Sequence, residues 1–141
     1  MRNTLLNGAS NSLFTALPAD LRAVISATTK YTDNTANGSN AAGNVTATSD
    51  KLFLLAEFEV FGQRYNANSA EQNYQQQYDY FKAGNSRISY NHAAVTTAVW
   101  WWLRSPYYNT SGYFCYVYTD GYYYYYTASW SAGVRAGFTS L

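Results

Sequence analysis

The sequence predicts an α+β domain built on a small antiparallel sheet with long loops. Apolar residues at helical spacing come first, and short runs of aromatic and β-branched residues gather toward the C-terminus. A hairpin signal, Asp120-Gly121 between tyrosine-rich runs, joins two of these runs. The length of 141 residues suits one domain, residues 1–141, which we expect to be a piece of a longer protein.

The first fifty residues predict a lead-in, a helix and a loop. Residues 1–11 are small and polar, as in a frayed lead-in or a short edge strand. Residues 12–29 predict one short helical turn and then a packed helix over about 18–27, with Pro18 in its first turn. The apolar stripe consists of Leu13, Leu17, Leu21, Val24 and Ile25. Residues 30–50 lack an apolar period, so we expect a long loop with a weak hairpin about Asn37-Gly38.

Two helices between two short strands are predicted for the middle of the chain. A short apolar run, 51–55, favours a buried strand, and 56–62 favours a short helix that ends at Gly62. A polar loop precedes a predicted helix over 71–82, which has Tyr74, Tyr78 and Phe81 on one face and ends at Gly84. A short strand at 87–90 and a linker at 92–97 follow.

Four strands are predicted near the C-terminus, two of which form a hairpin. Residues 98–103 favour a strand because aromatic residues and valine suit a half-buried sheet, and 134–138 is the last strand. The hairpin at Asp120-Gly121 allows a two-residue turn or a three-residue loop with Gly121 at positive φ. We prefer the loop, which pairs Tyr118 with Tyr122 and Val117 with Tyr123. It places Cys115, Val117, Tyr123 and Tyr125 inward, whereas a one-residue slip inverts the assignment.

Charge and hydropathy exclude several classes of partner. Charged residues make up only 12% of the chain and the net charge is +1, so no basic field exists to bind nucleic acid. No apolar run reaches the ~18 residues of a membrane span, so we expect no membrane insertion. The N-terminus also lacks the apolar core of a signal peptide.

The sequence offers little for catalysis or metal binding. It has one histidine, His92, and one cysteine, Cys115, which we interpret as a small core residue. A zinc site needs about four ligands, and the carboxylates show no calcium-loop spacing, so we expect neither metal nor cofactor. Glu57 or Glu59 is expected to pair with Arg104 or Arg135 in a structural role.

Tyrosine is the unusual component of the chain. Ten of its sixteen tyrosines lie in 107–126. Tyrosine gives a large contact area and a hydroxyl with only two torsions to restrict, so it is favoured in binding surfaces. A contiguous exposed aromatic patch usually marks an interaction site. The alternative interpretation is purely structural, a sheet with aromatic residues on both faces.

Two motifs that bracket the tyrosines resemble a known family. The motif Trp101-Trp-Leu-Arg-Ser-Pro106 opens this region and Gly133-Val-Arg-x-x-Phe138 closes it. The upstream run from Lys51 to Gly62 resembles the same family, so the resemblance covers roughly residues 12–141. The chain thereby resembles a domain family of unknown function from gut bacteria and their phages. That family is similar to the C-type lectin fold of variable proteins of diversity-generating retroelements. In those systems a reverse transcriptase mutates template adenines, which turns Asn codons into Tyr, Ser, Asp and other codons.

The resemblance implies a variable region of about 107–130 on a fixed scaffold. Trp101, Trp102, Leu103, Val134 and Phe138 would be core, and Arg104 and Arg135 would tie loops through carboxylates or carbonyls. The chain departs from the family's usual ending at Ala136 and Gly137, and it lacks the calcium-dependent sugar motifs of animal lectins. The implied ligand contacts are Tyr107, Tyr108, Asn109, Ser111, Tyr113, Tyr116, Tyr118, Tyr122, Tyr124, Tyr126, Ser129 and Trp130.

These observations lead to a non-enzymatic, hypervariable receptor-recognition domain on a phage tail or bacterial surface protein. Its expected partner is a protein or glycan receptor on a bacterial cell. The alternative is a structural or assembly module whose tyrosine-rich face packs on another domain or subunit. A hydrolase based on Cys115 is a third hypothesis, which an inert thiol would exclude.

Overall fold

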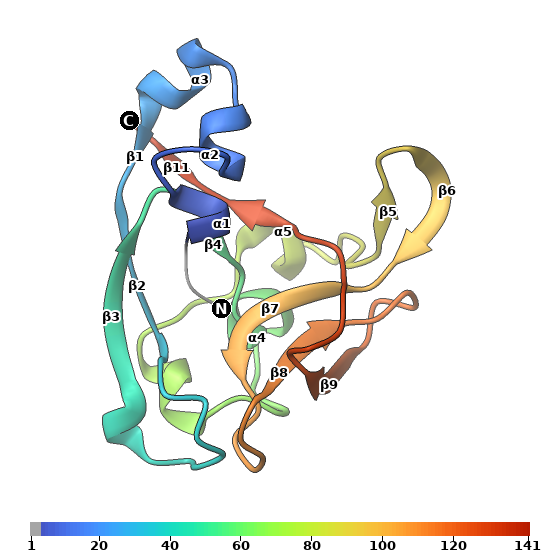
Figure 1. Ribbon diagram of the computed structural model, residues 1–141. Helices are drawn as coiled ribbons and strands as arrows, with labels where there is room; N and C mark the ends of the chain where they lie inside the picture. The colour runs from blue at the N-terminus through green and yellow to red at the C-terminus, as the bar shows by residue number, and fades with distance from the viewer. Residues whose placement is uncertain (1–3) are drawn as a thin grey trace.

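The computed structural model describes residues 4–141 and confirms a mixture of short helices and small antiparallel sheets (Figure 1). Every strand pair within those residues is antiparallel, apart from one isolated parallel bridge between Trp101 and Gly133. The largest sheet has three strands in the order β7-β8-β9. No helix among these residues is long and apolar enough to cross a membrane.

Three short helices lie near the N-terminus of the part of the chain that the structure describes, and the two after residue 12 are shorter and more exposed than predicted. They are α1 (Thr4–Asn7), α2 (Leu13–Ala16) and α3 (Ala19–Val24). The expected lead-in is therefore helical at Thr4–Asn7, and residues 1–3 of it lie outside the described residues. The prediction of a packed helix over 18–27 is wrong, because no residue of α2 or α3 is buried. The chain turns extended at β1 (Ile25–Ser26), where it pairs with β11 (Thr139–Ser140).

The predicted loop over 30–50 is instead a two-stranded hairpin. Strands β2 (Thr28–Asp33) and β3 (Val45–Asp50) pair from Thr28 opposite Asp50 to Asp33 opposite Val45. Their connection contains η1 (Ala42–Asn44) and Asn37-Gly38, so the expected turn position is confirmed. The strands escaped prediction because they are held by β-branched threonines rather than by an apolar alternation.

The middle of the chain is partly as predicted. Strand β4 (Phe53–Leu54) and helix α4 (Glu57–Phe61) confirm the predicted strand and helix, and Gly62 ends the helix at φ +73°. The single helix expected over 71–82 is wrong. That region holds η2 (Ser69–Asn73), an extended segment and α5 (Asp79–Lys82). The Tyr78 N–H donates to the Glu59 carbonyl at 3.0 Å, so a tertiary hydrogen bond replaces a helical one.

Strand β5 (Ser89–Asn91) lies close to the predicted 87–90 and pairs with β6 (Ala94–Val99). The latter occupies most of the segment that was expected to be a linker. The two strands form a hairpin that projects from the body of the molecule beside β7 (Figure 1). Because most of β6 is exposed, its Ala and Thr residues carried no core pattern from which a strand could be predicted.

The C-terminal sheet confirms the preferred register. It consists of β7 (Trp101–Pro106), β8 (Tyr113–Val117) and β9 (Tyr123–Thr127). Val117 pairs with Tyr123, and the Tyr118 N–H donates to the Tyr122 carbonyl at 2.9 Å across a loop that ends at Gly121, φ +85°. Cys115 and Val117 are fully buried as expected. Tyr125 shares their face but is 42% exposed, so its predicted burial is wrong.

The last segment contributes backbone rather than side chains to the core. It forms β10 (Ala136–Gly137), which pairs with β4, and then β11. Val134 is 54% exposed and Phe138 is 45% exposed, so their assignment to the core is wrong. A Cβ placed on Gly137 would lie 2.8 Å from the Phe53 ring, so the absence of a side chain there allows the close approach.

The hydrophobic core gathers beneath β7 and β8. It includes residues from β4, α4, α5 and the C-terminal sheet, with Trp101 and Leu103 at its centre. Trp102, on the opposite face of β7, is also only 2% exposed. The expected core residues Trp101, Trp102 and Leu103 are therefore buried, and they fix the sheet that carries the tyrosines.

We predict that Trp102→Ala lowers the free energy of unfolding by about 3–5 kcal/mol, because it removes a large buried ring. Val134→Ala is the matched control and is expected to change it by less than about 0.5 kcal/mol, as for an exposed side chain. Chemical denaturation followed by fluorescence or circular dichroism measures both. A Trp102→Ala variant as stable as the control would place that ring outside the packed interior.

Candidate binding surface and its support

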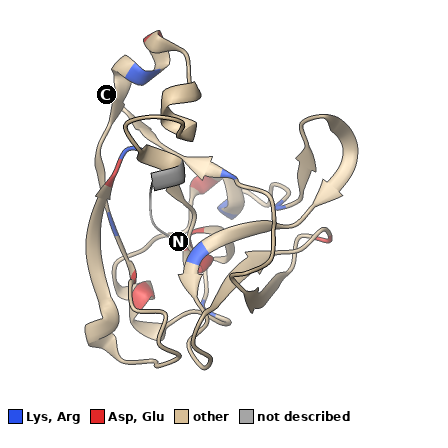
Figure 2. Cartoon of the chain, in the orientation of Figure 1, with Lys and Arg blue, Asp and Glu red and all other residues tan. Residues whose placement is uncertain are grey.

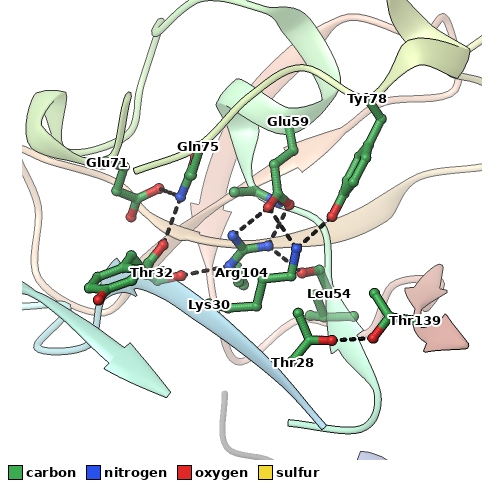
Figure 3. Close-up of polar contacts among 12 residues, drawn as sticks. Thr28, Lys30, Thr32, Leu54, Glu59, Glu71, Gln75, Tyr78, Arg104 and Thr139 are labelled. Atoms are coloured by element: carbon green, nitrogen blue, oxygen red, sulfur yellow. Dashed lines mark hydrogen bonds and ion pairs between the residues drawn. The ribbon is translucent and has the colours of Figure 1, made fainter. Parts of the chain in front are cut away.

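A buried ion pair joins α4 to β7 (Figure 3). Arg104 contacts Glu59 twice, with Nη1 2.5 Å from Oε2 and Nη2 2.9 Å from Oε1. Lys30 lies 3.2 Å from the same carboxylate. Burial alone would raise the pKa of Glu59, but the hydrogen bonds and charge of Arg104, with the charge of Lys30, lower it. The expected structural pairing of Arg104 with Glu57 or Glu59 is confirmed for Glu59.

Arg104 also reaches two further segments. Its Nη1 donates to the Leu54 carbonyl at 2.8 Å, and its Nε donates to Thr32 Oγ1 at 2.6 Å. One guanidinium therefore connects β2, β4, α4 and β7, using the fork of donors that arginine provides. This confirms the expectation that Arg104 ties segments together through carboxylates and carbonyls.

A second carboxylate, Glu57, holds the loop that follows α4. Its side chain is fully buried and accepts hydrogen bonds from the backbone N–H groups of Tyr65, Asn66 and Ala67 at 2.8–2.9 Å. Burial raises the pKa of Glu57, and the three amides oppose that rise. The loop thus has a defined shape without regular secondary structure.

The third buried carboxylate, Glu71, links η2 to β2 and β7. It accepts hydrogen bonds from Ser105 Oγ at 2.6 Å, from the Asp33 N–H at 2.9 Å and from Gln75 Nε2 at 3.2 Å. Burial raises the pKa of Glu71 to about 7, with the hydrogen bonds acting in the opposite direction. Sequence analysis did not single out this residue, because a lone glutamate gives no sign that it will be buried.

Arg135 behaves differently from the prediction. Its guanidinium lies over the rings of Trp101, Phe81 and Tyr80, at 5.1, 5.3 and 5.7 Å from their centroids. It makes no hydrogen bond or ion pair with another described residue, so the expected tie through carboxylates or carbonyls is wrong. A cation–π contact takes the place of that tie.

Cys115 is a core residue. It is fully buried, burial raises the pKa of its thiol well above the usual value, and its Sγ lies 3.8 Å from the Pro106 carbonyl. A protonated, inaccessible thiol is a poor nucleophile. Over residues 4–141, no three His, Cys, Asp or Glu side chains are grouped so that they could hold a metal ion.

The exposed side of the β8–β9 hairpin carries the first aromatic group, which we call the tyrosine face: Tyr116, Tyr118, Tyr124, Tyr126 and Trp130. Ring centroids lie 5.9 Å apart for Tyr116 and Tyr124, 5.6 Å for Tyr118 and Tyr124, and 5.2 Å for Tyr126 and Trp130. The pleat of β8 and β9 produces this side, since alternate residues point the same way. Four of the five side chains are at least 40% exposed.

The tyrosine face rests on two tryptophans of the β7 region. Trp100 lies 4.7 Å from Tyr116 and Trp102 lies 5.8 Å from it, both between ring centroids. Trp102 is buried, and its backbone N–H donates to the Gly133 carbonyl at 3.1 Å, which holds the neighbouring segment beside β7. The aromatic rings above are therefore positioned by a rigid base.

A second aromatic group lies on the other side of the sheet. Tyr107 stacks on Tyr125 at 3.8 Å and meets Tyr108 at 5.2 Å, and Arg64 lies 4.2 Å over the Tyr108 ring. Tyr113 lies near this group, 6.4 Å from Tyr125. Eight of the twelve predicted contact residues thus divide between two sides of one sheet, five on the tyrosine face and three beside Tyr125, because alternate residues of a strand point to opposite sides.

The remaining predicted contact residues lie on turns. Asn109 and Ser111 are exposed between β7 and β8, Ser129 is exposed after β9, and Tyr122 stands at the hairpin tip with 64% exposure. Two roles were not predicted from the sequence: Trp100 supports the tyrosine face, and Tyr125 is exposed. Tyr125 was expected to be buried because it pairs with Cys115, which is in the core. It is exposed because β9 is the edge strand of its sheet.

The aromatic surface is almost free of charge. Between Tyr113 and Thr127 the only charged residue is Asp120, at the tip of the hairpin. Figure 2 shows the same scarcity of charged residues across the β7-β8-β9 sheet. Contact through rings and hydroxyl groups is therefore the chemistry that this surface offers.

One family model matches the chain. It is described as Domain of unknown function (DUF6273) and covers residues 5–139. Because this is nearly the whole chain, the protein belongs to that family. No curated protein and no solved structure matches the chain.

The buried carboxylates predict a specific pH dependence. The pKa of Glu71 is about 7 in the folded protein, against an ordinary value of 4.5. Between these values the folded state binds more protons than the unfolded state, so this group makes the free energy of unfolding fall as the pH rises. We expect Glu71→Gln to remove this contribution to the dependence of the free energy of unfolding on pH. Urea denaturation at a series of pH values between about 4.5 and 7 measures it.

Glu59 provides the internal control, because its pKa is lowered rather than raised and its effect on stability therefore changes with pH in the opposite direction. Its contribution is present above the ordinary pKa of 4.5 and is lost as the pH falls further. The Glu71→Gln variant should still lose stability as the pH falls below about 4.5, whereas the Glu59→Gln variant should lose less. Identical slopes in the wild type and Glu71→Gln between about pH 4.5 and 7 would contradict the assignment of Glu71.

Proposed function

We propose that this member of the DUF6273 family is a non-enzymatic ligand-binding domain with a hypervariable, tyrosine-rich surface. Its scaffold would be a C-type lectin-like fold, and its parent protein a phage tail or bacterial surface protein. The partner would be a protein or glycan receptor on a bacterial cell. The proposal joins the resemblance of the sequence to retroelement variable proteins with the geometry of the tyrosine face.

One observation carries the proposal. Tyr118, Tyr124 and Tyr126 are 44%, 45% and 40% exposed although they lie on one side of a regular antiparallel hairpin, where Tyr118 contacts Tyr124 and Tyr126 contacts Trp130. Exposed rings at this density are unfavourable in water, and they usually mark a surface that a partner covers. Because their neighbours hold them in place, little side-chain entropy is lost on binding.

The separation of scaffold and surface supports variability. The hydrogen bonds of Glu57, Glu59 and Glu71 involve none of the tyrosine face, so its exposed members Tyr118, Tyr124, Tyr126 and Trp130 are open to exchange at small cost in stability. The fixed register of the Asp120-Gly121 hairpin keeps each position outward whatever its side chain. A binding surface whose residues vary needs a scaffold whose hydrogen bonds do not involve those residues, and a hairpin register that their replacement does not change.

A second candidate is an assembly module. Val134 and Phe138 are exposed apolar residues outside the variable region, and Trp130 at 57% exposure lies near them in sequence. A neighbouring domain or subunit of the parent protein could cover this strip. Solution size distinguishes the candidates, because a receptor-binding domain is expected to remain monomeric at concentrations at which an assembly module associates.

We predict that Tyr118→Ala and Tyr124→Ala each weaken binding to host cells by more than about 1 kcal/mol, roughly fivefold, while the melting temperature changes little. Labelled domain bound to intact bacteria, measured by flow cytometry, gives the affinity. Val95→Ala is the matched control, since Val95 is 74% exposed on β6, away from the tyrosine face.

The outcome that would contradict this proposal is a loss of stability in both tyrosine variants equal to the loss of binding. A second contradicting outcome is cell binding that neither substitution changes. In either case the rings would serve the fold or an internal contact rather than a receptor.

A further inference from the structure

A groove of about 330 Å³ lies between the tip of the β8–β9 hairpin and the segment that precedes β5. Asp120, Gly121 and Tyr122 line one wall, and Arg87 and Ile88 line the other. The walls meet at Gly121, where an added Cβ would lie 3.4 Å from Ile88 Cγ1. The volume is at the lower end of the roughly 300–1,000 Å³ typical of ligand sites, enough for one small ring.

Arg87 is held in place but keeps free donors. Its Nε donates to the Val60 carbonyl at 3.3 Å, its own carbonyl accepts the Trp101 indole N–H at 2.9 Å, and its guanidinium lies 4.9 Å over the Phe61 ring. Its two terminal nitrogens donate to no group among residues 4–141. A positioned guanidinium with unused donors is suited to an oxygen acceptor from a ligand.

Asp120 provides the complementary acceptor across the groove. Its Oδ1 accepts the Tyr122 N–H at 2.9 Å, which fixes the carboxylate within the hairpin loop. Its Oδ2 accepts no hydrogen bond from the residues that the structure describes. Donor and acceptor therefore line the same small groove, and their charges cancel.

Tyr122 adds an open ring face. It is 64% exposed, and no other aromatic ring in the described part of the chain stacks on it. Its neighbours differ, since Tyr118, Tyr124, Tyr125 and Tyr126 each contact another ring. Its ring is thus available to a flat apolar surface of a ligand.

These groups select a class of ligand by charge and shape. Because Arg87 and Asp120 together carry no net charge, the groove offers neither an anion nor a cation a net electrostatic attraction, and a neutral ligand is favoured. It must offer hydroxyl groups that both donate and accept, together with an apolar face for Tyr122. A pyranose ring has both features, with hydroxyls around its rim and C–H groups on its faces.

We propose that the groove binds one neutral monosaccharide unit of a glycan, with its ring on Tyr122 and its hydroxyls between Arg87 and Asp120. The inference deepens the proposed function and rests on it, because it makes the receptor a glycan that reaches from the tyrosine face into the groove. Sequence variation at Tyr122 would alter the stacking wall, whereas Arg87 lies outside the variable region and would stay constant.

The direct test is a two-dimensional NMR titration of the full chain with the methyl glycosides of glucose, galactose, mannose and N-acetylglucosamine. We expect at least one glycoside to shift the amide signals of Arg87, Ile88 and Gly121. The dissociation constant should be in the millimolar range, which corresponds to a binding free energy on the order of −4 kcal/mol. Tyr122→Ala and Arg87→Gln should each weaken this binding about tenfold. Tyr118→Ala, on the tyrosine face, should leave it unchanged.

A second variant protects the test against misfolding. Asp120→Asn keeps a turn-compatible residue and the acceptor for the Tyr122 N–H, and it should weaken the glycoside severalfold while the spectrum remains that of a folded domain. The inference would be overturned if no glycoside shifted the amides at the groove, or if Asp120→Asn and Arg87→Gln bound the glycoside as tightly as the wild type.

Treatment of cells separates this inference from the proposed function. Periodate cleaves vicinal diols of surface glycans, and we expect it to abolish cell binding by the domain. If binding survives periodate but is lost after protease treatment and in Tyr118→Ala, the receptor is a protein. The groove inference then fails while the proposed function stands.

Discussion

The contact between Arg104 and Glu59 is the interaction on which the fold most depends. The guanidinium donates to Glu59, Thr32 and the Leu54 carbonyl. It thereby joins β7 to α4, β2 and β4, and the three strands belong to three different sheets. Removing one partner from a buried ion pair leaves an uncompensated charge, at a cost of about 3–5 kcal/mol. Glu57 and Glu71 extend the same principle, because each satisfies backbone N–H groups that neither helix nor sheet would pair.

The internal hydrogen bonds leave the hairpin free for another purpose. Cys115 and Val117 anchor β8 in the core, so the outward side of β8 and β9 contributes little to the interior. Tyr116 and its neighbours instead rest on Trp100 and pack on one another. The same hairpin ends beside Arg87, which the scaffold positions, so the tip of the hairpin and the segment that precedes β5 adjoin at Gly121. Fold and proposed binding thus involve different residues of the same sheet.

Prediction from the sequence succeeded where a local signal was strong. Gly62 ended its helix, and Asp120-Gly121 determined the hairpin register, because both depend on a positive φ that glycine adopts readily. It failed where tertiary contacts decided. Residues 71–82 have a helical pattern, but the Tyr78 N–H donates to the Glu59 carbonyl and the Gln75 side chain donates to the Tyr31 carbonyl, so contacts with other segments set the course of the chain. Threonine-rich β2 lacked an apolar pattern. Most of the predicted contact residues are exposed, but the sequence could not show that the sheet divides them between two sides.

The central claim is that a constant frame displays a variable tyrosine surface. Sequencing the gene from many members of one population of its host cells or phage tests this most directly. The account predicts substitutions confined to about 107–130, at adenine-bearing codons and above all at Tyr116, Tyr118, Tyr124 and Tyr126, with Glu59 and Arg104 unchanged. Substitutions spread evenly along the chain would contradict it, and the hairpin would then be a fixed interface within a larger assembly.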